Sequence, residues 1–397
     1  MNFLADKSYL AVKPQSAAAT PVIPNVFLPL RAESVRINPN YAADRRMKGL
    51  DWKSDELLKG SRQIEGDIEV YADPDGLAHV LNMCMAKGST TGNGTDGYTH
   101  PFTPGEGKSY SIDIPRGNYA QRLYGVRGDQ LKLSYEDNKM VATLSIKALG
   151  QFYAASLAGA LTGAGMTSAV LSQAYGPRPT DGLVVGDVII AGGVEITLTS
   201  VDADGVTVGF ASTTVTASAG DPVYLKAQTP SMSTFREPFY MGGTLVGVAA
   251  DSASADTAAA SRSTAIPAYE LDVTLKNNLL DAPASGYMGP AALLNQVKEG
   301  QLTLKRIFSD PSQFEKWLDN VKQAVTIIAT GRFIKSDFST SEKLTVKLHN
   351  TKLLTNEEPL EVGSYIFDNQ SFEVLYDSSD AKAVEVTLVN HIAGTGL

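Results

Sequence analysis

The sequence predicts a mainly β protein with two related β-sandwich or half-barrel modules, each carrying one α-helix, and a small all-β insert between them. Three observations support this fold class. Residues typical of strands and turns are frequent, among them 35 glycines in 397 residues. Runs in which apolar and polar residues alternate recur along the chain. A pattern of a strand, an Asp-Pro pair and an amphipathic stretch occurs twice.

The composition is that of a globular protein with an acidic charge balance. Hydrophobic residues make up 43% of the chain, charged residues 19%, and the formal net charge is −9. This charge argues against a protein that grips nucleic acid through a basic surface, but it is compatible with one past which DNA slides. The single cysteine, Cys84, excludes an intrachain disulfide and predicts a reducing compartment.

Neither a secretory signal nor a membrane span is expected. Residues 1–15 carry Asp6, Lys7 and Lys13 and lack an apolar core. The uncharged stretch 148–177 consists largely of Ala, Gly, Ser and Thr, which contribute little to membrane insertion.

Residues 1–30 are predicted to form an extended N-terminal arm. Pro14, Pro21, Pro24 and Pro29 interrupt any helix in this region. Such an arm either stays unstructured or lies along a neighbouring subunit.

An internal duplication is the strongest signal in the chain. Residues 65–70 read Glu-Gly-Asp-Ile-Glu-Val, and residues 299–304 read Glu-Gly-Gln-Leu-Thr-Leu. An Asp-Pro pair follows each run, with Asp73 and Asp310 as helix N-caps and proline as the first helical residue. Both predicted helices carry apolar residues at the spacing of one buried face. The matching residues are Leu77, Val80, Leu81 and Cys84 in the first copy and Phe314, Trp317, Leu318 and Val321 in the second.

Alternating strands surround both helices, which predicts sheets with one face on a core and the other toward water. They lie at residues 110–114, 131–135 and 143–146 in the first copy and at 324–329, 344–348 and 384–388 in the second. We therefore assign residues 31–172 to module 1, with a return strand at about 230–250, and residues 266–397 to module 2.

A small β domain is predicted at residues 173–229, between the two modules. Its short strands are separated by the hairpin-type pairs Gly192-Gly193, Asp204-Gly205 and Gly220-Asp221. An Ig-like domain and an SH3-like barrel both fit this pattern. The tract 249–265, rich in Ala, Ser and Asp, is interpreted as a low-complexity linker.

The sequence gives no pattern typical of a catalytic, cofactor or metal site, so we expect neither an enzyme nor a bound cofactor. The four histidines, His79, His100, His349 and His391, do not stand at metal-ligand spacing. Residues 92–97 spell a dinucleotide-binding fingerprint, but they follow a predicted helix and precede a strand, the reverse of the required order.

The glycine-rich stretch 88–107 is long for a loop in a compact domain. Tyr98, His100 and Phe102 are embedded in it, which favours order against a partner. Surface disorder is the alternative interpretation.

Several of these segments resemble the tail-tube, or major tail, proteins of long-tailed bacteriophages of the siphophage type. The resemblance lies in residues 98–105, 124–131 and 271–279 and in the run 300–304 before the Asp310 helix. It covers most of residues 31–153 and 235–397 and leaves the insert outside. The resemblance implies β-sandwich modules whose inner sheets join across subunits into stacked rings. A duplicated module needs only three chains for a ring of six modules.

The resemblance also implies contact residues, because the long loop and the terminal arm bridge neighbouring rings in this family. In this chain the contact candidates are Tyr98, His100 and Phe102 in the loop and Pro21, Pro24 and Phe27 in the arm.

The tube lumens of this family tend to be acidic, which repels DNA from the wall. Asp67 and Glu69 share one face of their strand and are the lumen-facing candidates. Their counterparts in module 2 include Gln301 and Thr303, which are not acidic, so an outward-facing position stays open.

The expected function is that of a structural virion protein in the phage tail, assembled in the bacterial cytoplasm, whose rings form a conduit for DNA ejection. The expected partners are further copies in trimeric pseudo-hexameric or hexameric rings, a tape-measure protein, and tail terminator and baseplate proteins. DNA passes without specific binding, and no membrane is involved. Two alternatives stay open: another virion component, such as a capsid decoration or baseplate protein, and a carbohydrate-active or esterase enzyme on a β scaffold.

Overall fold

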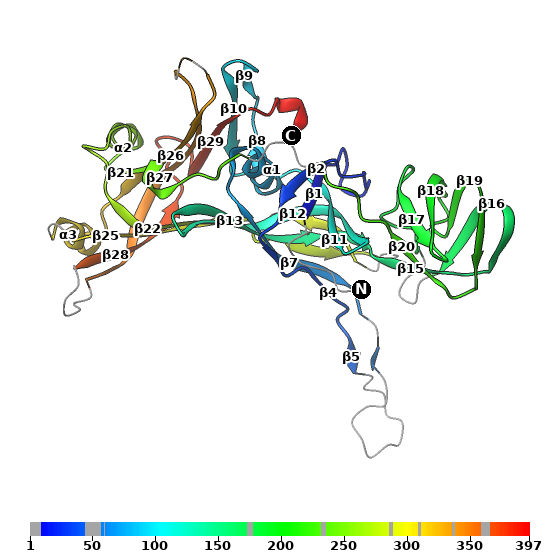
Figure 1. Cartoon of the computed structure of the whole chain (residues 1–397). Coiled ribbons are helices and arrows are strands. Elements are labelled where there is room, and N and C mark those ends of the chain that lie inside the picture. The colour runs from blue at the N-terminus through cyan, green and yellow to red at the C-terminus, as the bar shows by residue number, and fades with distance from the viewer. Residues whose placement is uncertain are drawn as a thin grey trace, which may run out of the picture.

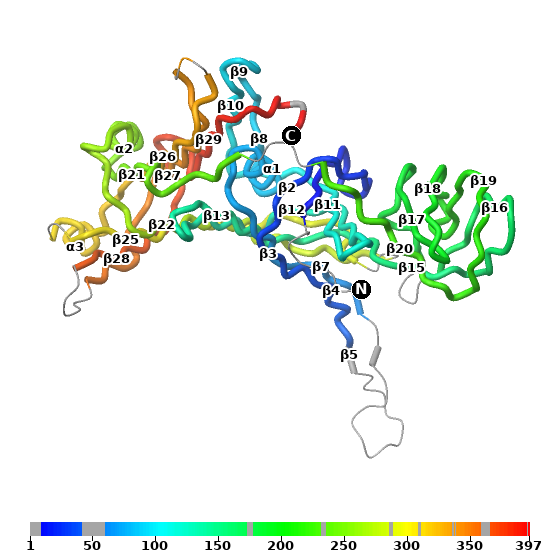
Figure 2. Tube along the Cα trace, in the orientation of Figure 1, coloured from blue at the N-terminus to red at the C-terminus, as the bar shows by residue number. Residues whose placement is uncertain are grey.

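The structure is a computed structural model that describes residues 9–43, 57–58, 60–172, 178–231, 236–285, 289–308, 311–335, 337, 339–358 and 366–397. In these residues the protein is mainly β, which confirms the predicted fold class at this level. Most strands belong to one connected sheet system, and six others form a closed barrel (Figure 1). The barrel and helix α3 lie at opposite ends of the molecule (Figure 2).

Module 1 contains one helix and fourteen strands in the described residues. They are β1 (Tyr9–Pro14), β2 (Val26–Pro29), β3 (Ala32–Glu33), β4 (Arg36–Asn38), β5 (Ala42–Ala43), β6 (Leu57–Leu58), β7 (Gln63–Tyr71), α1 (Pro74–Cys84), β8 (Ala86–Lys87), β9 (Thr91–Asn93), β10 (Gly97–Thr103), β11 (Tyr110–Arg116), β12 (Tyr119–Glu136), β13 (Lys139–Ala148) and β14 (Gly150–Phe152).

The long strand β12 takes part in two sheets. Its first half pairs with β11 and β14, and β11 continues to β1 and β2. Its second half pairs with β13, which continues to β7 and then to β3 and β4. A bulge between Gly128 and Gln130 marks the change of sheet, as expected where a strand bends.

The predicted N-terminal arm is corrected by the structure. β1 pairs with β2 and β11 of the same chain, and Leu10 and Val12 are buried in the core. Pro14 and Pro29 lie at strand ends, where a missing N–H does not interrupt a ladder. The prolines therefore excluded a helix but not a strand. Residues 1–8 lie outside the described residues.

The insert is a closed six-stranded barrel with its own core. Its strands are β15 (Ala154–Leu157), β16 (Leu161–Ser172), β17 (Val188–Ala191), β18 (Val194–Val201), β19 (Thr207–Ala217) and β20 (Pro222–Leu225). The predicted boundary at residue 173 is therefore too late, because β15 and β16 belong to the barrel. The sequence analysis did not assign β15 and β16 to the insert because residues 154–172 are uncharged and mostly small.

In the described residues, residues 266–397 contain the one predicted α-helix, α3, and a second helix, α2, lies before them in the predicted linker. The elements from residue 244 onward are β21 (Thr244–Ala249), α2 (Ser252–Ala259), β22 (Ala268–Lys276), β23 (Leu280–Pro283), β24 (Pro290–Leu294), β25 (Glu299–Ile307), α3 (Ser312–Leu318), β26 (Gln323–Phe333), β27 (Ser341–Glu357), β28 (Phe367–Leu375) and β29 (Val384–Asn390). The short 3-10 helices η2 (Met241–Gly243) and η3 (Gly394–Gly396) flank them.

Two predicted assignments around residue 250 are corrected. The return strand, β21, pairs with β26 of module 2 and not with module 1. The predicted linker contains α2, which begins after the N-cap Asp251 and packs on β21 with Ala255 and Ala259 buried. An alanine-rich tract is therefore a helix here, because one small-residue face fits closely on a strand.

The strand pairings of module 1 recur in module 2, in agreement with the duplication in the sequence. β7 pairs with β13 as β25 pairs with β28, and Gly66 faces Ile146 as Gly300 faces Val374. β11 and β12 likewise correspond to β26 and β27, β14 to β29, and β1 to β21. On the outer side of β7, β3 and β4 hold the place that β22 holds beside β25.

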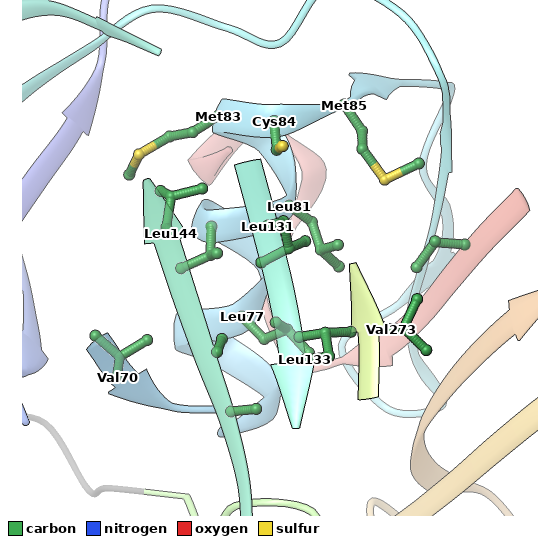
Figure 3. Close-up of a cluster of buried hydrophobic side chains, with 14 of the residues drawn as sticks. Val70, Leu77, Leu81, Met83, Cys84, Met85, Leu131, Leu133, Leu144 and Val273 are labelled. Atoms are coloured by element: carbon green, nitrogen blue, oxygen red, sulfur yellow. The ribbon is translucent and has the colours of Figure 1, made fainter. Parts of the chain in front are cut away.

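One sheet runs through both modules because β12 pairs with β22. We call the strands β4, β7, β13, β12, β22, β25, β28 and β27, with β3 beside β4, the shared sheet. Figure 3 shows Leu77 and Leu81 of α1 packed toward Leu131 of β12 and Val273 of β22. The two modules therefore share one core.

The two predicted helices differ in burial. Leu77, Leu81 and Cys84 of α1 are fully buried, and Asp73 caps the helix by accepting the N–H groups of Asp75 and Gly76, as predicted. The prediction of a buried face is wrong for most of the second helix, where three of the four matched side chains are exposed. Its proposed cap, Asp310, lies outside the described residues.

Candidate functional site

The contact residues predicted in the long loop lie inside the chain. β10 pairs with β29 of module 2, where His100 faces Leu388 and Phe102 faces Val386. His100 and Phe102 are fully buried, so the expectation that they contact another subunit is wrong, while Tyr98 is half-buried. The stretch is ordered against a partner, but that partner is the second module of the same chain.

A buried hydrogen-bond network fixes this contact between the modules. His100 Nε2 lies 2.9 Å from Asn390 Oδ1, and Asn390 Nδ2 donates to the carbonyl oxygen of Pro74 at 2.9 Å. Burial lowers the pKa of His100, so the ring is neutral at pH 7 and its Nε2–H is the donor. Strand β10, helix α1 and strand β29 are thereby joined.

The contact residues predicted in the arm also pack on their own chain. Pro24 is buried and Pro21 is half-buried. The rings of Phe27 and Tyr9 meet edge to face at 5.3 Å, and Gln228 donates to the carbonyl oxygen of Pro24 at 3.1 Å. Pro24 therefore lies inside its own chain rather than between subunits, and the expected intersubunit contact of the half-buried Pro21 and Phe27 stays a prediction.

The lumen candidates lie on the unpacked face of the shared sheet. Ile68 and Val70 point into the core, whereas Asp67 is exposed and Glu69 is half-exposed on the other face. Asp67 accepts a hydrogen bond from Ser145 Oγ at 2.6 Å, and Glu69 forms an ion pair with Arg31. The period-two rule therefore placed both carboxylates on one solvent face.

The charges on this face are largely balanced by cross-strand pairs. Besides Arg31–Glu69, the pairs are Arg36–Glu65, Lys132–Asp272, Lys276–Glu299 and Lys305–Glu270. These side chains are partly exposed, so each pair contributes little to stability. Their effect is to give the face a hydrated surface of both signs, whereas the family resemblance implies an acidic lumen.

The junction between the modules is a strand pairing supported by side chains. Gln130 faces Lys276 and Leu133 faces Val273 along β12 and β22. Just beyond β22, the buried Asn277 donates through Nδ2 to the carbonyl oxygens of Cys84, at 2.7 Å, and Gly128, at 2.8 Å. The junction is therefore specific in register as well as continuous.

Both ends of the shared sheet are open in the described part of the chain. At one end, residues 352–357 of β27 pair with β28 on one side, with a bulge at Leu354, and on the other side the Trp317 indole donates to the carbonyl oxygen of Leu354. We call this the β27 edge. At the other end, β3 and β4 pair with β7 alone, and we call residues 32–38 the β4 edge.

The two open edges correspond to the two sides of the internal junction. β12 and β27 hold equivalent places beside β13 and β28. On the other side, Arg36 faces Glu65 as Lys276 faces Glu299, with nitrogen–oxygen distances of 3.7 and 4.0 Å. Residues 32–36 and residues 352–353 thus hold the strand positions that meet each other at the internal junction, whereas the bulged Leu354 has no counterpart in residues 130–136 of β12.

The described residues contain no arrangement typical of hydrolytic catalysis that we could identify. No group of three or more His, Cys, Asp or Glu side chains is placed to hold a metal ion there. Ser252 Oγ and His349 Nδ1 both bind the same atom, Asp380 Oδ2, at 2.7 and 2.6 Å. The hydroxyl is therefore not directed at the imidazole, as an activated serine requires.

Among the described helices, none is long and apolar enough to cross a membrane. No protein-family model matches the chain, and no curated protein matches it.

The open edges were missed by the sequence analysis. An edge depends on which strand lies beside which, and the pairs between β12 and β22 join residues 140 to 146 positions apart. The duplication was the sequence signal that could have predicted these edges. A module that pairs with its copy through one side of its sheet leaves the other side of the sheet unpaired.

Proposed function

We propose that this protein is a self-assembling structural subunit of a phage tail, in which stacked rings form the tail tube and a conduit for DNA ejection. The observation that supports this best is the pair of open, complementary edges on a sheet whose internal junction supplies a template for joining them. The β27 edge of one copy pairs with the β4 edge of the next, as β12 pairs with β22. An interface of this head-to-tail kind closes into a ring when the rotation allows it.

The template also specifies a register. In the equivalent positions, Lys352 replaces Gln130 and Arg36 replaces Lys276, so Lys352 of one copy lies opposite Arg36 of the next. The repulsion between these two cations is offset by the acids that face them on the neighbouring strands, Glu373 and Glu65. Closing the edges satisfies the exposed backbone groups that otherwise invite aggregation.

Strand spacing favours a ring of three copies. Each chain contributes eight strand positions to the shared sheet, so three copies contribute twenty-four. At about 4.8 Å per strand the backbone diameter is about 37 Å before strand tilt, which admits a DNA duplex after side chains of about 5 Å on each wall. Two copies give about 24 Å, too narrow for a duplex, and six give about 73 Å, far wider than it needs.

The polar face of the shared sheet is the wall that DNA passes in this proposal. Its paired charges leave no continuous basic stripe, so phosphate groups find no extended site at which to release counterions. Asp67 adds an acidic group that lacks an ion-pair partner among the described contacts of this face. The tape-measure, terminator and baseplate proteins are the further partners of such a tube, and the virion tail is its location.

The test is electron microscopy of the purified protein, with end-on views averaged, for wild type and two variants at Leu354. Leu354 is the bulged residue between the pairs Leu353–Phe372 and Thr355–Ser371, and its carbonyl accepts from Trp317 at the open edge. Leu354→Pro therefore alters the edge without replacing a residue that is paired with β28. The matched control, Leu354→Ala, keeps the N–H.

We expect hollow tubes with threefold end views for wild type and Leu354→Ala, and only unassembled protein for Leu354→Pro. Single rings that never stack favour another virion component. Tubes formed equally well by Leu354→Pro contradict pairing at this edge, and wild-type protein that stays monomeric at every concentration contradicts the proposed function.

A further inference from the structure

Two equivalent helices differ sharply in how well they are covered. In α1 the residues Leu77, Leu81 and Cys84 are at most 1% exposed. Their counterparts in and after α3 are Phe314, Leu318 and Val321, which are 41%, 63% and 39% exposed. Apolar side chains spaced along one helix face are typical of a buried surface, so within the described part of the chain the α3 face lacks a cover that the α1 face has.

Most of the cover of α1 comes from strands of its own module, chiefly β12, and a further part comes from the following module. Helix α1 contacts β27 and β29 of module 2 in addition to strands of its own module, and Asn390 at the end of β29 binds the carbonyl oxygen of Pro74. Residues that belong to the second copy of the repeat therefore complete the burial of the helix of the first.

The repeat identifies the surface that takes the same place over α3. The pair β12–β14 in module 1 corresponds to the pair β27–β29 in module 2. The residue that directly follows β14 is Tyr153, whose side chain is 42% exposed. Over α3, the exposed ring of Tyr153 from module 1 of a second copy thus takes the position that the end of β29 takes over α1.

The geometry of the repeat points to one occupant: we propose that the α3 face, formed by Phe314, Leu318 and Val321, docks on the β14 end of module 1 in a second copy of this chain. This inference rests on the proposed function, since it uses the same head-to-tail order. It adds an apolar side-chain contact to the backbone pairing at the β27 edge. Trp317 links the two, because its indole donates to the β27 edge at Leu354 while Phe314 packs against its ring at 5.6 Å.

The first test is crosslinking between two differently marked copies. One preparation carries Leu318→Cys and the other Tyr153→Cys, and a short bis-maleimide is added to each alone and to the mixture. The native Cys84 is buried and does not compete. We expect a covalent dimer in the mixture and little in either preparation alone, because the interface joins different surfaces.

The second test measures the concentration at which rings or tubes form. Leu318→Asp places a charge in the docked face and is expected to raise that concentration about 10- to 100-fold. The control Val185→Asp changes a residue that is 60% exposed in the barrel segment and should leave assembly unchanged. Both positions are exposed, so neither variant removes core packing.

The outcomes separate this inference from the proposed function. Wild-type tubes with no mixed crosslink, together with normal assembly of Leu318→Asp, overturn the docking of α3 and leave the tube intact. Wild-type protein that remains monomeric overturns both. A mixed crosslink with loss of tubes in Leu318→Asp but not in Val185→Asp supports both.

Discussion

Asn390, in the last strand of the chain, donates its side-chain N–H to the carbonyl oxygen of Pro74, the first residue of α1, over a distance of 2.9 Å. The two residues are 316 positions apart in the sequence. The same amide accepts the Nε2–H of His100 and the backbone N–H of Ile392. A single buried side chain therefore joins the helix and the long loop of module 1 to module 2.

Asn390→Ala should destabilise the whole protein. It leaves the His100 N–H and the Pro74 carbonyl without their partner in a buried site, which we expect to cost about 2–4 kcal/mol. Urea unfolding measures this change. Asn25→Ala, at an exposed position, is the control and should change the unfolding free energy by less than about 0.5 kcal/mol. Equal effects of the two substitutions would contradict the role of the network.

Arg122→Met should loosen the attachment of the barrel. The guanidinium is 1% exposed and binds Asp113 of module 1 at 2.7 Å and Asp187 of the barrel segment at 2.6 Å. Removing it leaves two buried carboxylates, at a cost of about 3–5 kcal/mol.

The loss in Arg122→Met should be smaller at acidic pH. Burial already raises the pKa of Asp187, and without the arginine this carboxyl takes up a proton more readily, so stability is regained as the pH falls. Arg178→Met breaks the exposed pair with Asp181 and should have almost no effect at any pH. Thermal unfolding from pH 4.5 to 8 compares the variants, and a loss that does not vary with pH would contradict this account.

Asp73→Asn should change the pH dependence of stability without removing the helix cap. Burial raises the pKa of Asp73 from 3.8 to about 6, although the N–H groups of Gly76 and Asp75 oppose the shift. A raised carboxyl pKa gives stability that is complete below pH 3.8 and is lost as the pH rises through about 6, a change of about 3 kcal/mol.

The asparagine keeps the acceptor oxygen and does not titrate. The unfolding free energy of Asp73→Asn should therefore rise relative to wild type between pH 4 and pH 7, as measured by urea titration at each pH. Burial also lowers the pKa of His79, to about 4, but that residue titrates in both proteins and its effect cancels. A constant difference across this range would show that Asp73 titrates near its ordinary pKa.

Gly247→Ala should displace helix α2 from strand β21. A Cβ at Gly247 would lie 2.1 Å from the carbonyl oxygen of Ala255 and 2.6 Å from the N of Ala259. We expect a loss of about 1–3 kcal/mol, since the helix backbone must move. Gly242→Ala is the matched control, because its Cβ meets nothing within 4 Å. Circular dichroism with urea unfolding tests the pair, and equal stability of the two variants would contradict close packing of α2.

Cys84 should be inert toward thiol reagents in the folded protein. Burial raises the pKa of its thiol to about 12, so almost no thiolate forms near pH 8 and reagent has no access. We expect full reaction with a chromogenic disulfide only after unfolding in urea. Rapid reaction of the native protein would mean that α1 separates readily from the strands around it.

The sequence by itself determined the local elements that depend on neighbouring residues. Alternation placed Ile68 and Val70 on one face of β7 and Asp67 on the other, and Asp73 with Pro74 set the start of α1. The repeated run at 65–70 and 299–304 also identified β7 and β25 as equivalent strands, because duplication preserves pattern regardless of tertiary context.

Only the tertiary structure decided which elements meet. From the sequence, His100 and Phe102 were expected in an exposed loop, but β10 pairs with β29, almost 290 residues away. Leu318 was expected in the core, but its helix lies at the end of the shared sheet and the side chain is exposed. The physical reason is that apolar spacing specifies a face to be covered but not its cover. That choice depends on the relative placement of distant segments, and in our proposal it extends, for the α3 face and the two open edges, to a second copy of the chain.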